Sequence, residues 1–128
     1  MENAHDLQVM IVAGPEDPRR AILGLSMAAS AASTGAKVNL YLVMGGARFL
    51  LKENCSRILV EGYPSVAELV EVVHDSGGTV GYCPNCLDSQ CTPALPGLTE
   101  VKSFCHLAHP RGMSTFGMRM TTIPTVVF

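Results

Sequence analysis

Tryptophan is absent from the sequence, aromatic residues make up only 5% of it, and charged residues only 16%. Hydrophobic residues reach 48%, so the chain is too apolar and too weakly charged to be intrinsically disordered. The formal net charge of −2 lacks the basic excess of a dedicated nucleic-acid binder, and we expect no nucleic-acid partner. A chain of 128 residues has the length of one domain, so we expect a single domain over residues 1–128.

Membrane and export signals are also lacking. The longest uncharged segment, 21–36, is shorter than the run of about 20 apolar residues that a spanning helix needs, and it contains glycine, serine and threonine. The first residues include Glu2 and Asp6 but no lysine or arginine, unlike the start of a signal peptide. We therefore expect a cytoplasmic protein with no membrane association and with reduced thiols.

Phosphate-binding and serine-hydrolase motifs are missing as well. The segment GPEDP after the first apolar run is neither G-x-G-x-x-G nor a P-loop, and Glu16 and Asp17 would repel phosphate. The sequence contains no G-x-S-x-G nucleophile elbow. Nucleotide binding and serine-hydrolase chemistry are therefore not expected.

Short apolar runs alternate with helical patterns along most of the chain. Asp17 and Pro18 are typical of a helix N-cap and first turn, and Gly35 is typical of a helix end. Ser65 and Glu68 form the sequence pattern of a capping box. The alternation predicts βαβ units and a parallel sheet with helices on both faces. The predicted strands are 7–13, 37–44, 79–83, 101–105 and 123–128, and the predicted helices are 18–34, 47–53, the segment from 65 to 77, and 110–120.

Sites in open parallel sheets form at the carboxyl ends of the strands. In this sequence those ends are the Gly14–Pro15 loop, the Gly45–Gly46 loop and Cys83. The last of them leads directly into the densest group of cysteines, since Cys83, Cys86 and Cys91 lie within nine residues. This edge of the sheet is therefore the predicted functional site.

The local pattern around Cys83 favours thiol chemistry. Pro84 fits the first position of a helix, which places Cys83 at the N-cap. The unpaired N–H groups and the dipole of a helix start stabilise a thiolate, and the thiolate is the nucleophilic form. Because the chain has five cysteines, a closed disulfide framework would leave one thiol over.

Four interpretations of these cysteines stay open. Cys83 carries a sulfur atom as a persulfide, or Cys83 and Cys86 cycle between dithiol and disulfide. A third interpretation is a tetrahedral zinc site, and a fourth is that the cysteines are simply buried. The metal alternative uses Cys83, Cys86, Cys91 and a fourth ligand from Cys105, His106 or His109. His106, His109 and Arg111 are either partners of a sulfur species or parts of a solvated loop, and Cys55 is expected to be incidental.

Three segments together resemble the DsrE/DsrF-like family. They are VMIVAGPEDPRRAILGLSMAASAASTGAKVNLYLVMGGARFLL, PSVAELVEVVHDSGGTVGYCPNC and TIPTVVF, and they span nearly the whole chain. The resemblance implies a three-layer α/β/α sandwich with a mainly parallel sheet of about five strands. It also implies a homo-oligomer, a trimer or hexamer.

The resemblance further implies an intracellular sulfur-relay role, with Cys83 passing sulfane sulfur between donor and acceptor proteins. A sulfur carrier and an enzymatic sulfurtransferase both fit this role. Cys86 and Cys91 depart from the family's single-cysteine pattern, so a thiol–disulfide oxidoreductase and a non-enzymatic oligomeric module with a metal site stay open. No cofactor is expected, with zinc or an iron–sulfur centre as the alternative.

Overall fold

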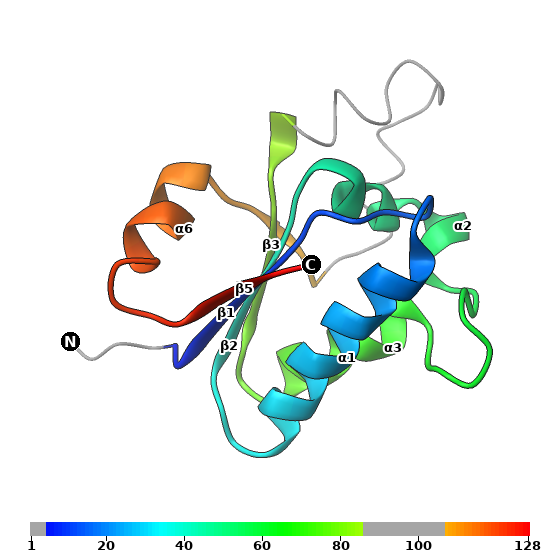
Figure 1. Cartoon of the computed structure of the whole chain (residues 1–128), viewed down its shortest axis with the longest axis horizontal. Helices are drawn as coiled ribbons and strands as arrows, with labels where there is room; N and C mark the ends of the chain where they lie inside the picture. The colour runs from blue at the N-terminus through cyan, green and yellow to red at the C-terminus, as the bar shows by residue number, and fades with distance from the viewer. Residues whose placement is uncertain (1–4, 86–106) are drawn as a thin grey trace.

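The computed structural model describes residues 5–85 and 107–128, which form an α/β fold around a five-stranded sheet (Figure 1). The strand order is β4-β3-β2-β1-β5, and all four pairings between neighbouring strands are parallel. The strands are β1 (Leu7–Ile11), β2 (Val38–Leu42), β3 (Thr79–Tyr82), β4 (His109–Pro110) and β5 (Thr125–Val127). The predicted fold class, a parallel α/β sheet, is confirmed.

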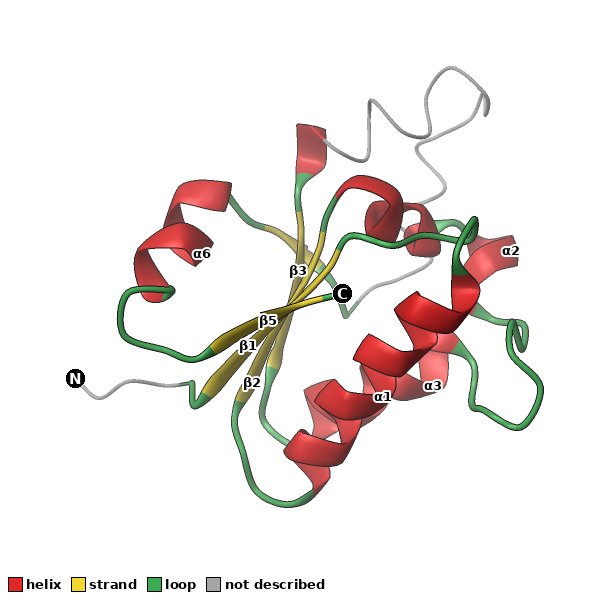
Figure 2. Ribbon diagram, in the orientation of Figure 1, coloured by secondary structure: helices red, strands yellow, loops and turns green. Residues whose placement is uncertain are grey.

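Helices lie on both faces of this sheet (Figure 2). In the described part of the chain, one face carries two helices that pack against each other, and the other face carries one short helix. The first face has α1 (Pro18–Ser33) and α3 (Val66–Asp75), and the second has α6 (Met113–Arg119). A 3-10 helix, η1 (Met44–Leu50), and α2 (Lys52–Cys55) follow β2. Within the described residues, no helix is long and apolar enough to cross a membrane.

The helix ends follow the predicted capping pattern. The Asp17 carboxylate accepts a hydrogen bond from the Arg20 amide at 3.4 Å. The Ser65 hydroxyl accepts one from the Glu68 amide at 3.2 Å, and the Glu68 carboxylate accepts one from the Ser65 amide at 2.9 Å. Each bond satisfies an amide that the helix leaves without an internal partner, which confirms both predicted helix starts.

Two segments differ from the sequence-based expectation. The predicted helix 47–53 is divided into η1 and α2. The predicted helix 110–120 is wrong at its start, because His109–Pro110 form β4 beside β3 and the helix begins at Met113. A two-residue edge strand contains too few residues to show an alternating pattern. The predicted strand 101–105 lies outside the described residues.

The face under α1 and α3 is the aliphatic core. Leu40, Ile11 and Val38 are buried on the strands and Leu25 is buried on α1, each essentially without solvent exposure. Full burial of such a side chain contributes about 1.5–3 kcal/mol. Gly24 lets α1 approach the sheet closely, since a Cβ atom there would lie 2.7 Å from Ile11 Cδ1.

The opposite face of the sheet, under α6, carries aromatic and polar side chains. Tyr41 of β2 stacks on Phe116 of α6, with ring centroids 4.9 Å apart. Around this aromatic pair the strands present Gln8, Asn39 and Thr79, which bond to one another across the sheet. Because side chains alternate between the faces of a strand, these polar residues lie on the α6 side while their neighbours enter the aliphatic core.

Candidate functional site at the carboxyl end of the third strand

Cys83 directly follows β3, at the carboxyl edge of the sheet. Its amide donates to the Leu42 carbonyl oxygen at 3.2 Å, which extends the pairing of β3 with β2 by one residue. Pro84 and Asn85 have helical backbone, so Cys83 immediately precedes the first helical residue. This local geometry is the one predicted from the Cys-Pro sequence. Cys83 is a free thiol and is buried, at 5% exposure.

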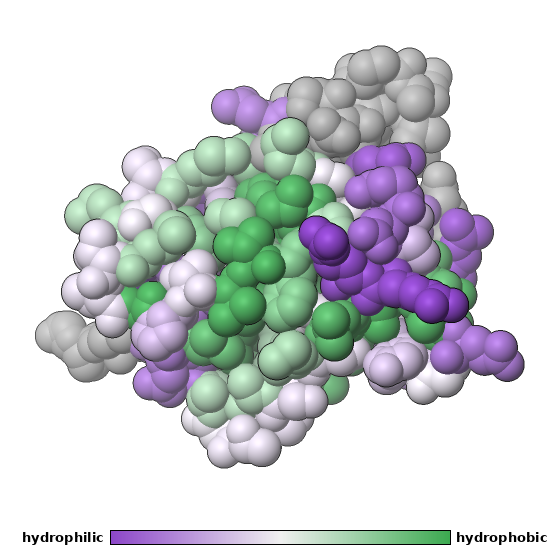
Figure 3. Space-filling model, viewed as in Figure 1, coloured by the Kyte–Doolittle hydropathy of each residue, from purple (hydrophilic) through white to green (hydrophobic). Residues whose placement is uncertain are grey.

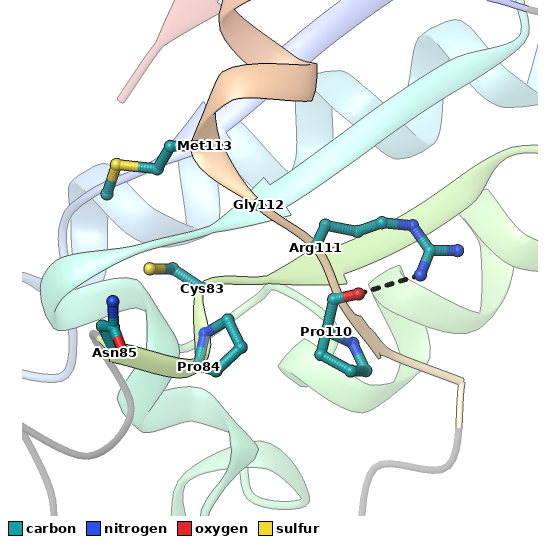
Figure 4. A pocket seen from close by; sticks show the side chains of 7 residues that line it. All are labelled: Cys83, Pro84, Asn85, Pro110, Arg111, Gly112 and Met113. Atoms are coloured by element: carbon teal, nitrogen blue, oxygen red, sulfur yellow. Dashed lines mark hydrogen bonds between the residues drawn. The ribbon is translucent and has the colours of Figure 1, made fainter.

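The thiol lines a cavity of about 650 Å³. The lining consists of Cys83, Pro84, Asn85, Pro110, Arg111, Gly112 and Met113, which come from the end of β3 and from the connection between β4 and α6. Figure 4 shows the Cys83 sulfur directed into the space between Met113 and Asn85. Small-molecule pockets usually measure roughly 300–1,000 Å³, so a small thiol or the tip of a partner's loop fits here.

The immediate surroundings of the sulfur are largely apolar. Met113, Pro84 and Pro110 form walls of the cavity, and Arg111 is the one charged residue in its described lining. The Arg111 guanidinium points away from the sulfur in Figure 4, and its Nη1 donates to the Pro110 carbonyl oxygen at 2.9 Å. Arg111 therefore does not contact the thiol in this conformation. Cys83 is only 5% exposed, which limits the access of water to the sulfur.

The other predicted site residues are only partly placed. Cys86, Cys91, Cys105 and His106 lie outside the described residues, so the Cys83/Cys86 pair and the metal alternative stay predictions. His109 is exposed on β4, opposite Gly81 in the register of the sheet. In residues 5–85 and 107–128, no three or more His, Cys, Asp or Glu side chains form a group that could hold a metal ion.

The two glycine loops at the same edge of the sheet do not line the cavity. The Glu16 carboxylate accepts a hydrogen bond from the Gly14 amide at 2.9 Å. A Cβ atom at Gly14 would lie 2.4 Å from the Gly45 carbonyl oxygen, so the two loops are pressed against each other. Of the three predicted strand ends, only the one at Cys83 lines this cavity.

A second cavity lies on the α6 side of the sheet, and sequence reasoning missed it. It measures about 130 Å³ and shares Arg111 and Gly112 with the first cavity. The lining is His5, Asn39, Tyr41, Thr79, Arg111, Gly112, Thr115, Phe116 and Arg119. The available sequence signal was a polar residue inside each of two otherwise apolar strands, Asn39 and Gln8.

His5 is the titratable group buried at this second cavity. The imidazole Nε2 and the Thr79 hydroxyl are 3.0 Å apart, and Arg119 Nη1 lies 3.5 Å from Nδ1. Burial is the main cause that lowers the pKa of His5, and the nearby Arg119 and Lys37 charges lower it further. The negative charge of Asp6 raises the pKa of His5 and so opposes these effects. The surroundings of His5 therefore disfavour an added positive charge.

The sequence matches the model of the DsrE/DsrF-like family over residues 7–93, which is more than half of the chain. The protein is thus a parallel α/β protein with a buried thiol at a strand end, and it belongs to the DsrE/DsrF-like family, whose members are generally related to sulfur relay. No curated protein matches the sequence.

Two solved structures share the fold. The YchN protein from E. coli has a TM-score of 0.73 at 13% identity, covering 97% of this chain and 99% of its own. BT1422 from Bacteroides thetaiotaomicron, a conserved protein of unknown function, has a TM-score of 0.61 at 12% identity, with 96% of this chain and 95% of its own covered. At such low identity these likenesses establish the fold alone.

Proposed function

We propose that the protein is a sulfur-relay component that carries sulfane sulfur as a persulfide on Cys83. The observation that carries the proposal is the free Cys83 thiol at a strand end, directed into a cavity of about 650 Å³ and followed at once by helical residues. Membership of the DsrE/DsrF-like family supports the same chemistry. The proposal locates the protein in the cytoplasm, where thiols stay reduced.

The transfer consists of two thiolate displacements that balance without an external oxidant. The Cys83 thiolate attacks the outer sulfur of a donor persulfide, the donor's sulfur–sulfur bond breaks, and the donor leaves as a thiolate. The acceptor thiolate then attacks the outer sulfur on Cys83, and the Cys83 thiolate is regenerated. The buried position of Cys83, at 5% exposure, limits the access of water to its sulfur between the two steps.

The proposed partners are sulfur-donor and sulfur-acceptor proteins and further copies of the chain. β5 is an edge strand of the described sheet, and its Val126 and Val127 are exposed, as are Leu23 and Met27 of α1. Figure 3 shows hydrophobic residues gathered over the middle of this face. Exposed apolar patches of this kind commonly mark subunit contacts, which supports the proposed trimer or hexamer.

The experiment is mass spectrometry of the reduced protein after exposure to a persulfide donor. We expect a mass increase of one sulfur atom that maps to Cys83. Cys83→Ser should lose the label, whereas Cys55→Ala removes the other described cysteine and should retain it. A label that is absent from the wild-type protein, or that persists in Cys83→Ser, would contradict the proposal.

The thiol–disulfide alternative is tested by Cys86→Ser. If Cys83 acts as a sulfur carrier, it still accepts the sulfur atom from the donor and passes it to an acceptor thiol. If the two cysteines form a redox couple, the variant loses all turnover because the resolving thiol is gone. Sulfur transfer that survives the substitution supports the carrier, and its complete loss supports the couple.

A further inference from the structure

The α6 face of the sheet carries a continuous row of hydrogen-bonded polar side chains. Thr79 donates to Asn39 Oδ1 at 2.8 Å, and Asn39 Nδ2 donates to Gln8 Oε1 at 2.9 Å. Gln8 Nε2 then donates to the Thr125 hydroxyl at 3.2 Å and to the Phe116 carbonyl oxygen at 3.3 Å. The row crosses β3, β2, β1 and β5, so its polar groups are largely occupied by one another.

The row also determines which nitrogen of His5 carries the proton. The Thr79 hydroxyl gives its only hydrogen to Asn39, so it accepts from His5 Nε2–H. His5 Nδ1 is then an acceptor, and it faces the Arg119 guanidinium at 3.5 Å. Neutral His5 therefore orients Arg119 at the rim of the second cavity.

Arg111 is held at the same cavity by close packing on the sheet. Its Cγ would lie 2.8 Å from a Cβ atom at Gly81, so the absence of a side chain at Gly81 leaves room for the aliphatic part of Arg111. The Arg111 carbonyl oxygen accepts a hydrogen bond from the Tyr41 hydroxyl at 2.8 Å. Two arginines, Arg111 just before α6 and Arg119 at its end, thus line one small cavity.

Among the described residues, no carboxylate neutralises either guanidinium. The described lining of the cavity contains no Asp or Glu, and across residues 5–85 and 107–128 neither Arg111 nor Arg119 forms an ion pair with one. A guanidinium has five N–H donors, and within the described part of the chain each of these two makes a single hydrogen bond. The site therefore combines excess positive charge with donors that are still available.

The size of the cavity restricts the ligand. About 130 Å³ is well above the roughly 10–15 Å³ that one water molecule needs. It is well below the roughly 300–1,000 Å³ of usual cofactor pockets, so a nucleotide does not fit. A small ion with a few waters fits, and planar guanidinium groups bind two oxygens of such an ion at once.

We propose that the cavity between the sheet and α6 binds a small tetrahedral oxyanion through Arg111 and Arg119. The proposal goes beyond the sulfur-relay function, because it involves neither Cys83 nor a covalent step. Thr115 also lines the cavity, and a threonine hydroxyl is a further donor for such an ion. Sulfate and phosphate share the required chemistry, so they are tested side by side.

The experiment is a titration of the full chain with sodium sulfate and with sodium phosphate, followed by NMR of the arginine side-chain N–H groups. Chloride keeps the ionic strength constant, because general screening would otherwise mimic binding. We expect saturable shifts of the Arg111 and Arg119 signals with at least one anion. A tighter response to one of the two identifies the preferred oxyanion. Shifts that do not saturate with either anion would overturn the proposal.

Charge-removing variants supply the control. Arg111→Gln and Arg119→Gln should each weaken the binding about tenfold or more, since a charge-assisted hydrogen bond is lost. Arg19→Gln removes the same charge from an exposed position on α1, across the sheet, and should change the affinity less than about twofold. An equal loss in all three variants would show non-specific attraction and would overturn the proposal.

Folding and sulfur transfer are checked separately. Arg111 and Arg119 are exposed, so their substitution should leave the circular dichroism spectrum unchanged. If a variant does unfold, Thr115→Val tests the same site from a neutral position and should weaken the binding. Cys83→Ser should retain oxyanion binding in full, so a failed sulfur-transfer assay and a failed oxyanion titration are distinguishable. Loss of oxyanion binding in Cys83→Ser would contradict the proposed independence of the two sites.

Discussion

The sheet face under α1 and α3 buries aliphatic side chains, whereas the face under α6 buries a hydrogen-bonded row of polar ones. The first face is covered by a helix of 16 residues and one of 10, the second by a helix of 7. The Cys83 cavity and the second cavity are each lined in part by residues of α6. The difference indicates that the face under α1 and α3 mainly stabilises the fold, while the face under α6 presents polar side chains at the second cavity.

The largest loss of stability should follow from a substitution that creates a cavity in the aliphatic core. Leu25→Ala empties a position with 0% exposure and should lower the free energy of unfolding by about 2–5 kcal/mol. Leu23→Ala, on the same helix but 51% exposed, should change it by only about 0.5 kcal/mol. Urea denaturation measures both. Similar losses in the two variants would contradict the assignment of this face as the stabilising core.

An intermediate effect is expected on the polar face. Asn39→Ala removes one hydrogen bond to Gln8 and one from Thr79, and it leaves the buried Gln8 side chain with an unpaired oxygen. The free energy of unfolding should fall by about 1–3 kcal/mol. Thr34→Ala breaks an exposed hydrogen bond to Ala31 and should cost about 0.5 kcal/mol or less. If Asn39→Ala is as mild as Thr34→Ala, the polar row contributes little to stability.

The smallest expected effect is the contribution of His5 to the pH dependence of stability. Because its pKa is lowered from 6.5, mainly by burial and then by Arg119, the unfolded chain takes up the His5 proton at higher pH than the folded one. This contribution to stability is present above pH 6.5 and is lost as the pH falls through 6.5 toward the lowered pKa.

The groups that face His5 are Arg119 from α6, Lys37 before β2, Thr79 on β3 and the adjacent Asp6. In His5→Gln, urea denaturation near pH 7.5 and near pH 5.5 should show a smaller loss of stability on acidification than in the wild type. The variant cannot titrate at this position, so an unchanged pH dependence would show that the folded state does not disfavour protonation of His5.

Much of the fold could be predicted because it follows from local signals. Asp17 with Pro18, and Ser65 with Glu68, mark helix starts through contacts within one turn, and the structure confirms both. The mostly apolar runs around Ile11 and Leu40 indicate strands that are buried in a parallel sheet. The strand at His109–Pro110 escaped prediction because two residues are too few to show a hydrophobic or alternating pattern.

At the site, the adjacent apolar run, cysteine and proline are enough to predict that Cys83 ends a strand and precedes a helix. That Arg111 and Arg119 share a cavity with His5 is visible only in the folded protein. These residues come together because β4 pairs with β3 and α6 packs on the sheet. The tertiary structure likewise excluded the Gly14 and Gly45 loops from the Cys83 cavity, because the two loops pack against each other. Helix caps and strand ends depend on residues that are neighbours in the sequence. A cavity depends on which distant segments the folded sheet brings side by side.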